Sequence, residues 1–151
     1  AAGGSVTRVT NDPANDDSPA WSPAGGYLVF ASTRDGGDPD IFITSEDGGE
    51  LTQLTSNSAK DTSPAWSPNG ARIAFVSNRD GGDDIYVMDT SGGGVVRLTS
   101  VGNAQAPTWS LDGSLILFSA GGDLFVVSAG GGAAQPFFAG AGFDTDPAWS
   151  R

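Results

Sequence analysis

The chain contains neither cysteine nor histidine among its 151 residues. Without cysteine there is no disulfide framework and no thiolate metal site, so redox chemistry gives no information on the cellular compartment. Without histidine the usual zinc ligand and general base are missing, which excludes a Ser-His-Asp arrangement. The nucleophile motif G-x-S-x-G is absent as well. We therefore expect a protein without enzymatic activity and with no required cofactor.

Basic residues are also few, with seven Lys and Arg against 18 Asp and Glu and a formal net charge of −11. Nucleic acids and anionic membrane surfaces are bound mainly through Lys and Arg, so neither is the expected partner. A cation or a basic protein surface is the better electrostatic match. No apolar run approaches the roughly 20 residues that cross a bilayer, and residues 1–4 do not resemble a signal peptide. The sequence predicts a soluble chain.

What the chain does have is one short motif in four copies, and each copy contains one of the four tryptophans. The copies are residues 18–23, 63–68, 106–110 and 146–150. The tryptophans follow one another at intervals of 45, 43 and 40 residues. A period of this size is the signature of a repeat architecture.

Each repeat contains four short apolar or alternating segments separated by turns rich in glycine and proline. We expect strands at 16–21, 27–32, 40–45 and 50–55, then at 61–66, 72–77, 84–89 and 95–99, and then at 105–109, 114–119, 123–128 and 134–138. Four antiparallel strands per roughly 40–45 residues are typical of a β-propeller blade. The predicted fold class is therefore all-β, a β-propeller of four-stranded antiparallel blades with about three and a half blades in this chain.

The predicted boundaries make the chain a single partial propeller domain, 1–151. Its repeats span 11–55, 56–99 and 100–138, with an outer strand at 5–10 and an inner strand at 144–150. Propellers close with typically 4–8 blades, and an open array of three would leave apolar blade faces in water. We therefore expect either closure by homo-oligomerisation, most simply as a dimer, or a place within a longer propeller.

The repeated motifs P-A-W-S-P-(N/D)-G, I-A-F-x-S-x-R-D-G, D-I-Y-V-M-D and R-L-T resemble the TolB-like (PD40, WD40-like) β-propeller repeat. Residues 61–99 match best. The first repeat departs at Ala24, and the third lacks the S-x-R-D-G loop and keeps only Gly121 and Gly122.

The resemblance implies a propeller fold and a periplasmic or extracellular location. It also implies a scaffold that binds a protein or peptide on its axial face. Two other functions stay open, because family members include propellers attached to peptidases and because the repeats could serve self-assembly alone. In the first case the chain is the accessory or gating domain of a larger hydrolase. In the second it is a minimal self-assembling fragment.

Two sets of side chains are candidates for special roles. The tryptophans occupy equivalent positions on the innermost strands, and we expect them to pack between neighbouring blades rather than to stack on a ligand. The two S-x-R-D-G loops contain Arg34 and Arg79, which a catalytic interpretation would use. The structural interpretation, in which each arginine pairs with a carboxylate of a nearby blade, is favoured.

Asp16, Asp61 and Asp144 each precede the proline of a P-A-W motif by three residues. At the entry to the innermost strands they are expected to point toward the central channel. Converging carboxylates bind hard cations such as Ca²⁺ or Mg²⁺, and some propellers of the family that the chain resembles carry a channel cation. The third repeat interrupts the set with Ala104. Two hypotheses stand, a channel Ca²⁺ site and a set of solvated residues that end the preceding loops.

Overall fold

The computed structural model describes residues 6–138 and 147–149 and contains three four-stranded antiparallel sheets, each a propeller blade. Blade 1 comprises β1 (Asp16–Trp21), β2 (Tyr27–Ser32), β3 (Asp40–Ser45) and β4 (Leu51–Gln53). Blade 2 comprises β5 (Asp61–Trp66), β6 (Arg72–Ser77), β7 (Asp84–Asp89) and β8 (Val96–Arg97). Blade 3 comprises β9 (Ala104–Trp109), β10 (Leu115–Ala120), β11 (Asp123–Ser128) and β12 (Gln135–Phe138). The strands of each blade are paired in chain order.

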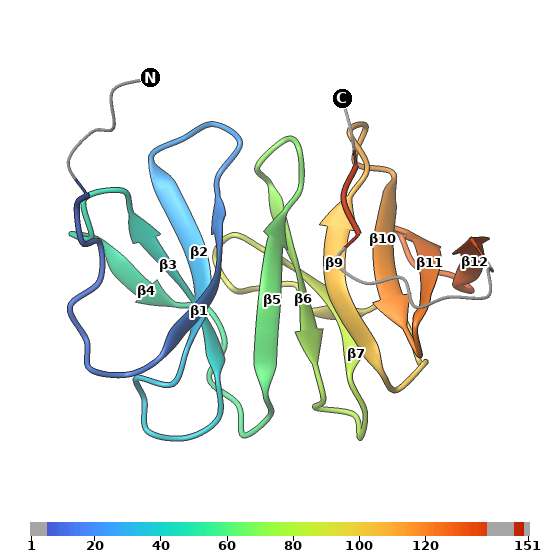
Figure 1. Cartoon of the computed structure of the whole chain (residues 1–151), viewed down its shortest axis with the longest axis horizontal. Helices are drawn as coiled ribbons and strands as arrows, with labels where there is room; N and C mark the ends of the chain where they lie inside the picture. Colours follow the sequence, from blue (N-terminus) through green and yellow to red (C-terminus); the bar gives the residue numbers. More distant parts are fainter. Residues whose placement is uncertain (1–5, 139–146, 150–151) are drawn as a thin grey trace.

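The blades stand side by side in a row, with their first strands β1, β5 and β9 on the same side (Figure 1). This arrangement confirms the predicted all-β propeller architecture. The described residues form no helix, and so none with the length and apolar character that a membrane crossing requires.

The second and third strands of blade 2 are apolar at nearly every position because each of their faces meets a neighbouring blade. Ile73 and Phe75 pack in one core cluster with blade 1 residues such as Val29. Ala74 and Val76, the alternate residues of the same strand, pack in a second cluster with blade 3. Successive side chains of a strand point to opposite faces, so continuous apolar sequence is what a sheet covered on both sides requires.

The tryptophans join each blade to the one before it. The Trp66 indole donates its Nε1–H to the carbonyl of Ala20 at 3.1 Å, and Trp109 donates to the carbonyl of Ala65 at 3.0 Å. Both contacts run from one innermost strand to the preceding one. The expected packing between blades is therefore confirmed for these two residues.

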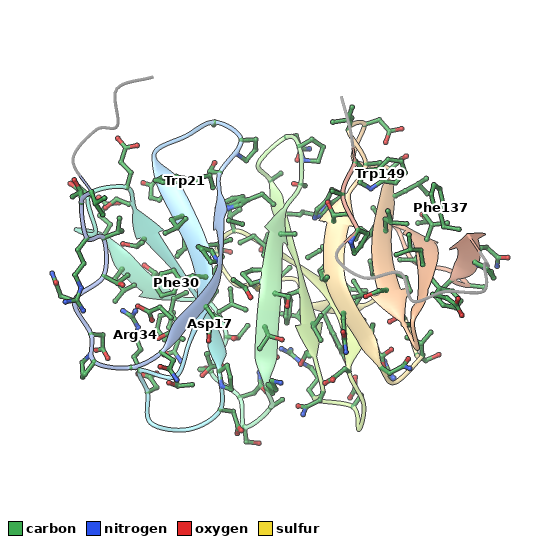
Figure 2. The ribbon with its side chains drawn as sticks, viewed as in Figure 1. Asp17, Trp21, Phe30, Arg34, Phe137 and Trp149 are labelled. Atoms are coloured by element: carbon green, nitrogen blue, oxygen red, sulfur yellow. The ribbon has the colours of Figure 1, made fainter. Side chains whose placement is uncertain are left out.

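Trp21 differs from its counterparts because no described blade precedes it. Its side chain lies at one end of the row (Figure 2) and is 58% exposed, whereas Trp109 is 6% exposed. At the opposite end, Trp149 meets Phe137 edge to face with ring centroids 5.9 Å apart. The burial of each tryptophan thus depends on its neighbour and not on the motif alone.

The two predicted end strands have different outcomes. Residues 6–10 are not a strand, although the backbone of Val9 packs closely against Gly48 in the turn between β3 and β4. An outer strand needs the third strand of its own blade as a partner, and the described residues provide none for this segment. The predicted inner strand 144–150 lies mostly outside the described residues, and residues 147–149 are not assigned to a strand.

Candidate functional site

The innermost strands carry the same backbone irregularity in each blade. Ser18, Ser63 and Ala106, each directly before a proline, have positive φ angles of 53°, 52° and 47°. At these positions the pairing of each first strand with the second shifts register, which marks a β-bulge. A left-handed conformation is costly for a residue other than glycine, so its recurrence in three blades shows that the surrounding fold imposes it.

These bulges line a shallow concavity of about 370 Å³ on the channel side of the three blades. Its wall is formed by Ser18, Pro19, Ser63, Pro64, Ala106, Pro107, Thr108 and Pro147. The innermost strands of a propeller surround its central channel, so this surface is the described part of the channel wall. Its composition of prolines, small residues and irregular backbone was not predicted as a site from the sequence.

The Asp61 side chain, predicted to point toward the channel, is 0% exposed. The Arg79 guanidinium bonds both of its carboxylate oxygens, at 2.9 and 3.1 Å, and the Asn57 amide donates to Oδ2 at 2.9 Å. Asp16 holds the same position in blade 1 and accepts from Arg34 Nη2 at 2.8 Å. Burial alone raises the pKa of Asp16, but hydrogen bonds from Ser32, Thr10 and Arg34 lower it overall.

Each of these arginines also lies over a pair of neighbouring aromatic rings. The Arg34 guanidinium lies 5.0 Å from the ring centroid of Phe30 and 4.9 Å from that of Phe42. Figure 2 shows Arg34 below Phe30 in blade 1. Arg79 lies 5.3 and 4.9 Å from the corresponding rings of blade 2. The arginine of the S-x-R-D-G loop therefore pairs within its own blade, and not with a neighbouring blade as predicted, because aspartate and rings converge on it there.

Blade 3 has the corresponding pair of aromatic rings but neither the aspartate nor the arginine. Phe118 and Phe125 stack with centroids 5.8 Å apart, and Ala104 stands where blade 2 has Asp61. The shortened loop at Gly121 and Gly122 supplies no arginine. The aspartate and the arginine are thus present together or absent together, as expected if they form one structural unit.

The described residues contain no cluster of three or more acidic side chains that could hold a metal ion. Asp144 lies outside them, so the predicted set of Asp16, Asp61 and Asp144 stays a prediction. The two members that are described fit a cation poorly, because their carboxylate oxygens already bind guanidinium groups.

A second acidic position opens each third strand, and here blades 1 and 2 differ. Asp84 accepts from Arg97 Nη2 at 2.6 Å and from the Thr99 hydroxyl at 2.8 Å. Asp40 accepts only from neutral groups, the Gln53 amide at 3.1 Å and the Thr55 hydroxyl at 3.0 Å. Burial raises the pKa of Asp40, whereas at Asp84 hydrogen bonds, first that from Arg97, outweigh burial and lower the pKa.

Replacing Gln53 with arginine should copy the blade 2 network into blade 1 and stabilise the protein at pH 7 by about 1 kcal/mol. The raised pKa of Asp40 means that its ionisation disfavours the folded state as pH rises, and a guanidinium partner reverses this. The gain should therefore be complete above the raised pKa of Asp40 and be lost as pH falls through the lowered pKa that the arginine gives this carboxyl. Urea unfolding at pH 7 and pH 3 measures it. Arg97→Gln is the matched control and should cost stability at pH 7 more than at pH 3.

The chain is similar to known proteins both in sequence and in structure. The family model described as "TolB beta propeller domain" matches residues 1–123. The Tol-Pal system protein TolB of Syntrophus aciditrophicus is 50% identical over 46 residues, which are 30% of this chain and 10% of that protein.

Solved structures agree on the fold. TolB from Acinetobacter baumannii matches with a TM-score of 0.80 at 24% identity, over 91% of this chain and 35% of that one. A putative TolB from Agrobacterium tumefaciens matches with a TM-score of 0.79 at 27% identity, over 89% and 50%. An oligogalacturonate lyase from Vibrio parahaemolyticus also shares the fold, with a TM-score of 0.60 at 18% identity over 78% and 35%. The chain thus spans half or less of each of these relatives.

Proposed function

Because the chain belongs to the TolB β-propeller family, we propose that it is a non-enzymatic propeller scaffold that binds a protein or peptide on its axial face. The observation that supports this function is the channel-side concavity, to which all three blades contribute the same bulged segment. The strands that carry these segments, β1, β5 and β9, are edge strands of their sheets, and an extended peptide can pair with an exposed sheet edge.

The inventory of reactive groups also favours binding over catalysis. The chain has no histidine or cysteine, and Asp16 and Asp61, at the start of two innermost strands, are held by arginines. A general acid or base needs a pKa suited to its task and access to a substrate, and neither aspartate has this access. We therefore propose that any enzymatic activity associated with this propeller resides outside these residues.

A photo-cross-linking experiment tests the axial face. We expect p-benzoylphenylalanine at Ser63, in the channel wall, to capture a discrete protein or peptide partner from the periplasmic fraction of the source organism. The purified partner should then bind the unaltered chain in a direct titration. The same probe at Val95, which is exposed on the outer side of blade 2, is the control. Equal capture at both positions, or no direct binding, would rule out the axial site.

Two alternatives remain as proposals of lower rank. If the chain is the gating domain of a larger hydrolase, the gene that encodes it should also encode a catalytic domain. If it is a minimal self-assembling propeller, the isolated 151-residue chain should form a closed dimer. Light scattering measures the mass in solution, and a second run with chelator tests whether a channel Ca²⁺ takes part. A mass that matches the monomer in both runs would oppose dimerisation.

The location that we propose is periplasmic or extracellular, and it follows from the family and not from a feature of the described residues. Fractionation of the source cells tests it directly.

A further inference from the structure

The interfaces between blades carry two corresponding clefts that open at the end of the blades where the β1–β2 and β3–β4 turns lie. The first, between blades 1 and 2, is lined by residues that include Tyr27, Glu50, Trp66 and Thr90. The second, between blades 2 and 3, is lined by residues that include Arg72 and Ala129. The end in question is uppermost in Figure 1.

Strand register shows which residues correspond. Tyr27 opposes Ser45 in blade 1, and Arg72 opposes Asp89 in blade 2, so Tyr27 and Arg72 hold the same place on their second strands. Trp66 and Trp109 end the first strands of the following blades. Thr90 and Ala129 each follow directly after a third strand. The two clefts are therefore copies of one site with different contents.

In the second cleft an arginine of the chain itself bridges the two blades. The Arg72 guanidinium lies 4.9 Å from the centroid of the Trp109 ring. Its Nη1 donates to the backbone carbonyl of Ala129 at 3.0 Å. The cavity that remains has a volume of about 250 Å³. This cleft shows directly which chemical group the site accepts, a planar cation stacked on an indole ring.

In the first cleft the corresponding residue, Tyr27, does not bridge the two blades. The Tyr27 hydroxyl donates to the Glu50 carboxylate of its own blade at 3.1 Å. The cavity is larger, about 410 Å³, and the half-buried Trp66 ring lines it. Among the residues that the structure describes, no lysine or arginine stacks on Trp66. The cleft therefore has the indole platform and the Glu50 carboxylate, but no cation.

We propose that the cleft between blades 1 and 2 binds an arginine side chain of a basic partner peptide, with its guanidinium over Trp66 and paired with Glu50. The net charge of −11 favours the approach of a basic partner. Arginine fits better than lysine because its flat, weakly hydrated head stacks on an aromatic ring while its donors reach a carboxylate. This cleft shares no lining residue with the channel concavity, and the proposal does not depend on peptide binding in that concavity.

The probe is the capped tripeptide acetyl-Gly-Arg-Gly-amide, and its neutral isostere with citrulline in place of arginine is the control. Titrated into the ¹⁵N-labelled chain at low salt, the arginine peptide should shift the Trp66 indole N–H signal saturably, with a Kd in the millimolar range. The citrulline peptide should bind at least tenfold more weakly. The Trp66→Phe variant assigns the signal among the four tryptophans. Glu50→Gln should weaken binding roughly fivefold, as expected for an exposed charge pair.

Exchanging the corresponding residues Tyr27 and Arg72 tests the proposed cleft by mutation of the chain itself. Tyr27→Arg should fill the first cleft as Arg72 fills the second, and it should abolish the peptide response at Trp66. Arg72→Tyr should open the second cleft and make the Trp109 indole responsive. An undiminished response in Tyr27→Arg, equal binding of the citrulline peptide, or no shift at Trp66 up to tens of millimolar overturns the proposal. Loss of cross-linking at Ser63 would leave it standing, because that result concerns the channel alone.

Discussion

Replacing Trp109 with alanine should lower the free energy of unfolding by about 3–5 kcal/mol, the range for truncating a buried aromatic side chain. Trp109 is 6% exposed and belongs to the core cluster between blades 2 and 3. Its indole also donates to the Ala65 carbonyl and carries the Arg72 guanidinium. The substitution therefore removes apolar burial, one hydrogen bond and one cation–π contact together. Urea denaturation monitored by far-ultraviolet circular dichroism measures the change.

Trp21→Ala is the matched control, because it removes the same side chain from the same motif at a position with 58% exposure. It should cost no more than about 1 kcal/mol in the 151-residue chain. Trp109→Phe isolates the hydrogen bond, since it keeps most of the apolar volume and loses the indole donor. If Trp21→Ala and Trp109→Ala cost the same, the packing between blades does not govern the stability of these tryptophans.

The contrast between these residues shows what the sequence can and cannot predict. The period of the motif and the apolar segments between the turns were enough to predict twelve strands in three blades, because each repeat carries the same local signals. How far each tryptophan is buried, however, depends on the blades that stand next to it. Trp21 and Trp109 share a motif and differ only in whether a blade stands on the adjoining side, which no local pattern encodes.

The candidate metal site shows a second limit of prediction from the sequence. The spacing of Asp16 and Asp61 from the motif prolines correctly identified them as equivalent residues. Their direction depends on the arginines 18 residues later, which turn both carboxylates into their blades. A signal was present in the sequence, because the third repeat lacks the aspartate and the arginine together at Ala104 and Gly121. Joint loss of two residues indicates that they form a pair.

The channel wall was missed for a different reason. Ser63 and its counterparts Ser18 and Ala106 adopt positive φ, although none is a glycine or an asparagine. Residue type therefore gave no indication of the bulge. The proline that follows each of them disfavours a right-handed helical conformation in the residue before it, but this leaves extended backbone as the default expectation. The bulge arises from pairing with the second strand, which is a tertiary effect.

Replacing Arg79 with methionine should destabilise the protein by about 3–5 kcal/mol, because it leaves a charge buried without its partner. Asp61 is 0% exposed, and without Arg79 its described partner would be the Asn57 amide alone. Methionine retains an unbranched apolar stem but not the guanidinium that lies over Phe75 and Tyr86, so the loss combines the unpaired charge with two cation–π contacts. Chemical denaturation at pH 7 measures it.

The double variant Asp61→Ala with Arg79→Met should recover a substantial part of this loss. It gives blade 2 the alanine that blade 3 already has at Ala104, a blade that folds with neither ion. Arg34→Met should cost less than Arg79→Met, because the Asp16 carboxylate keeps 19% exposure and remains partly hydrated. Additive losses in the double variant would mean that the two residues stabilise the blade independently. Recovery would mean that the pair fixes the loop and strand relative to each other, with a net contribution far smaller than either single loss.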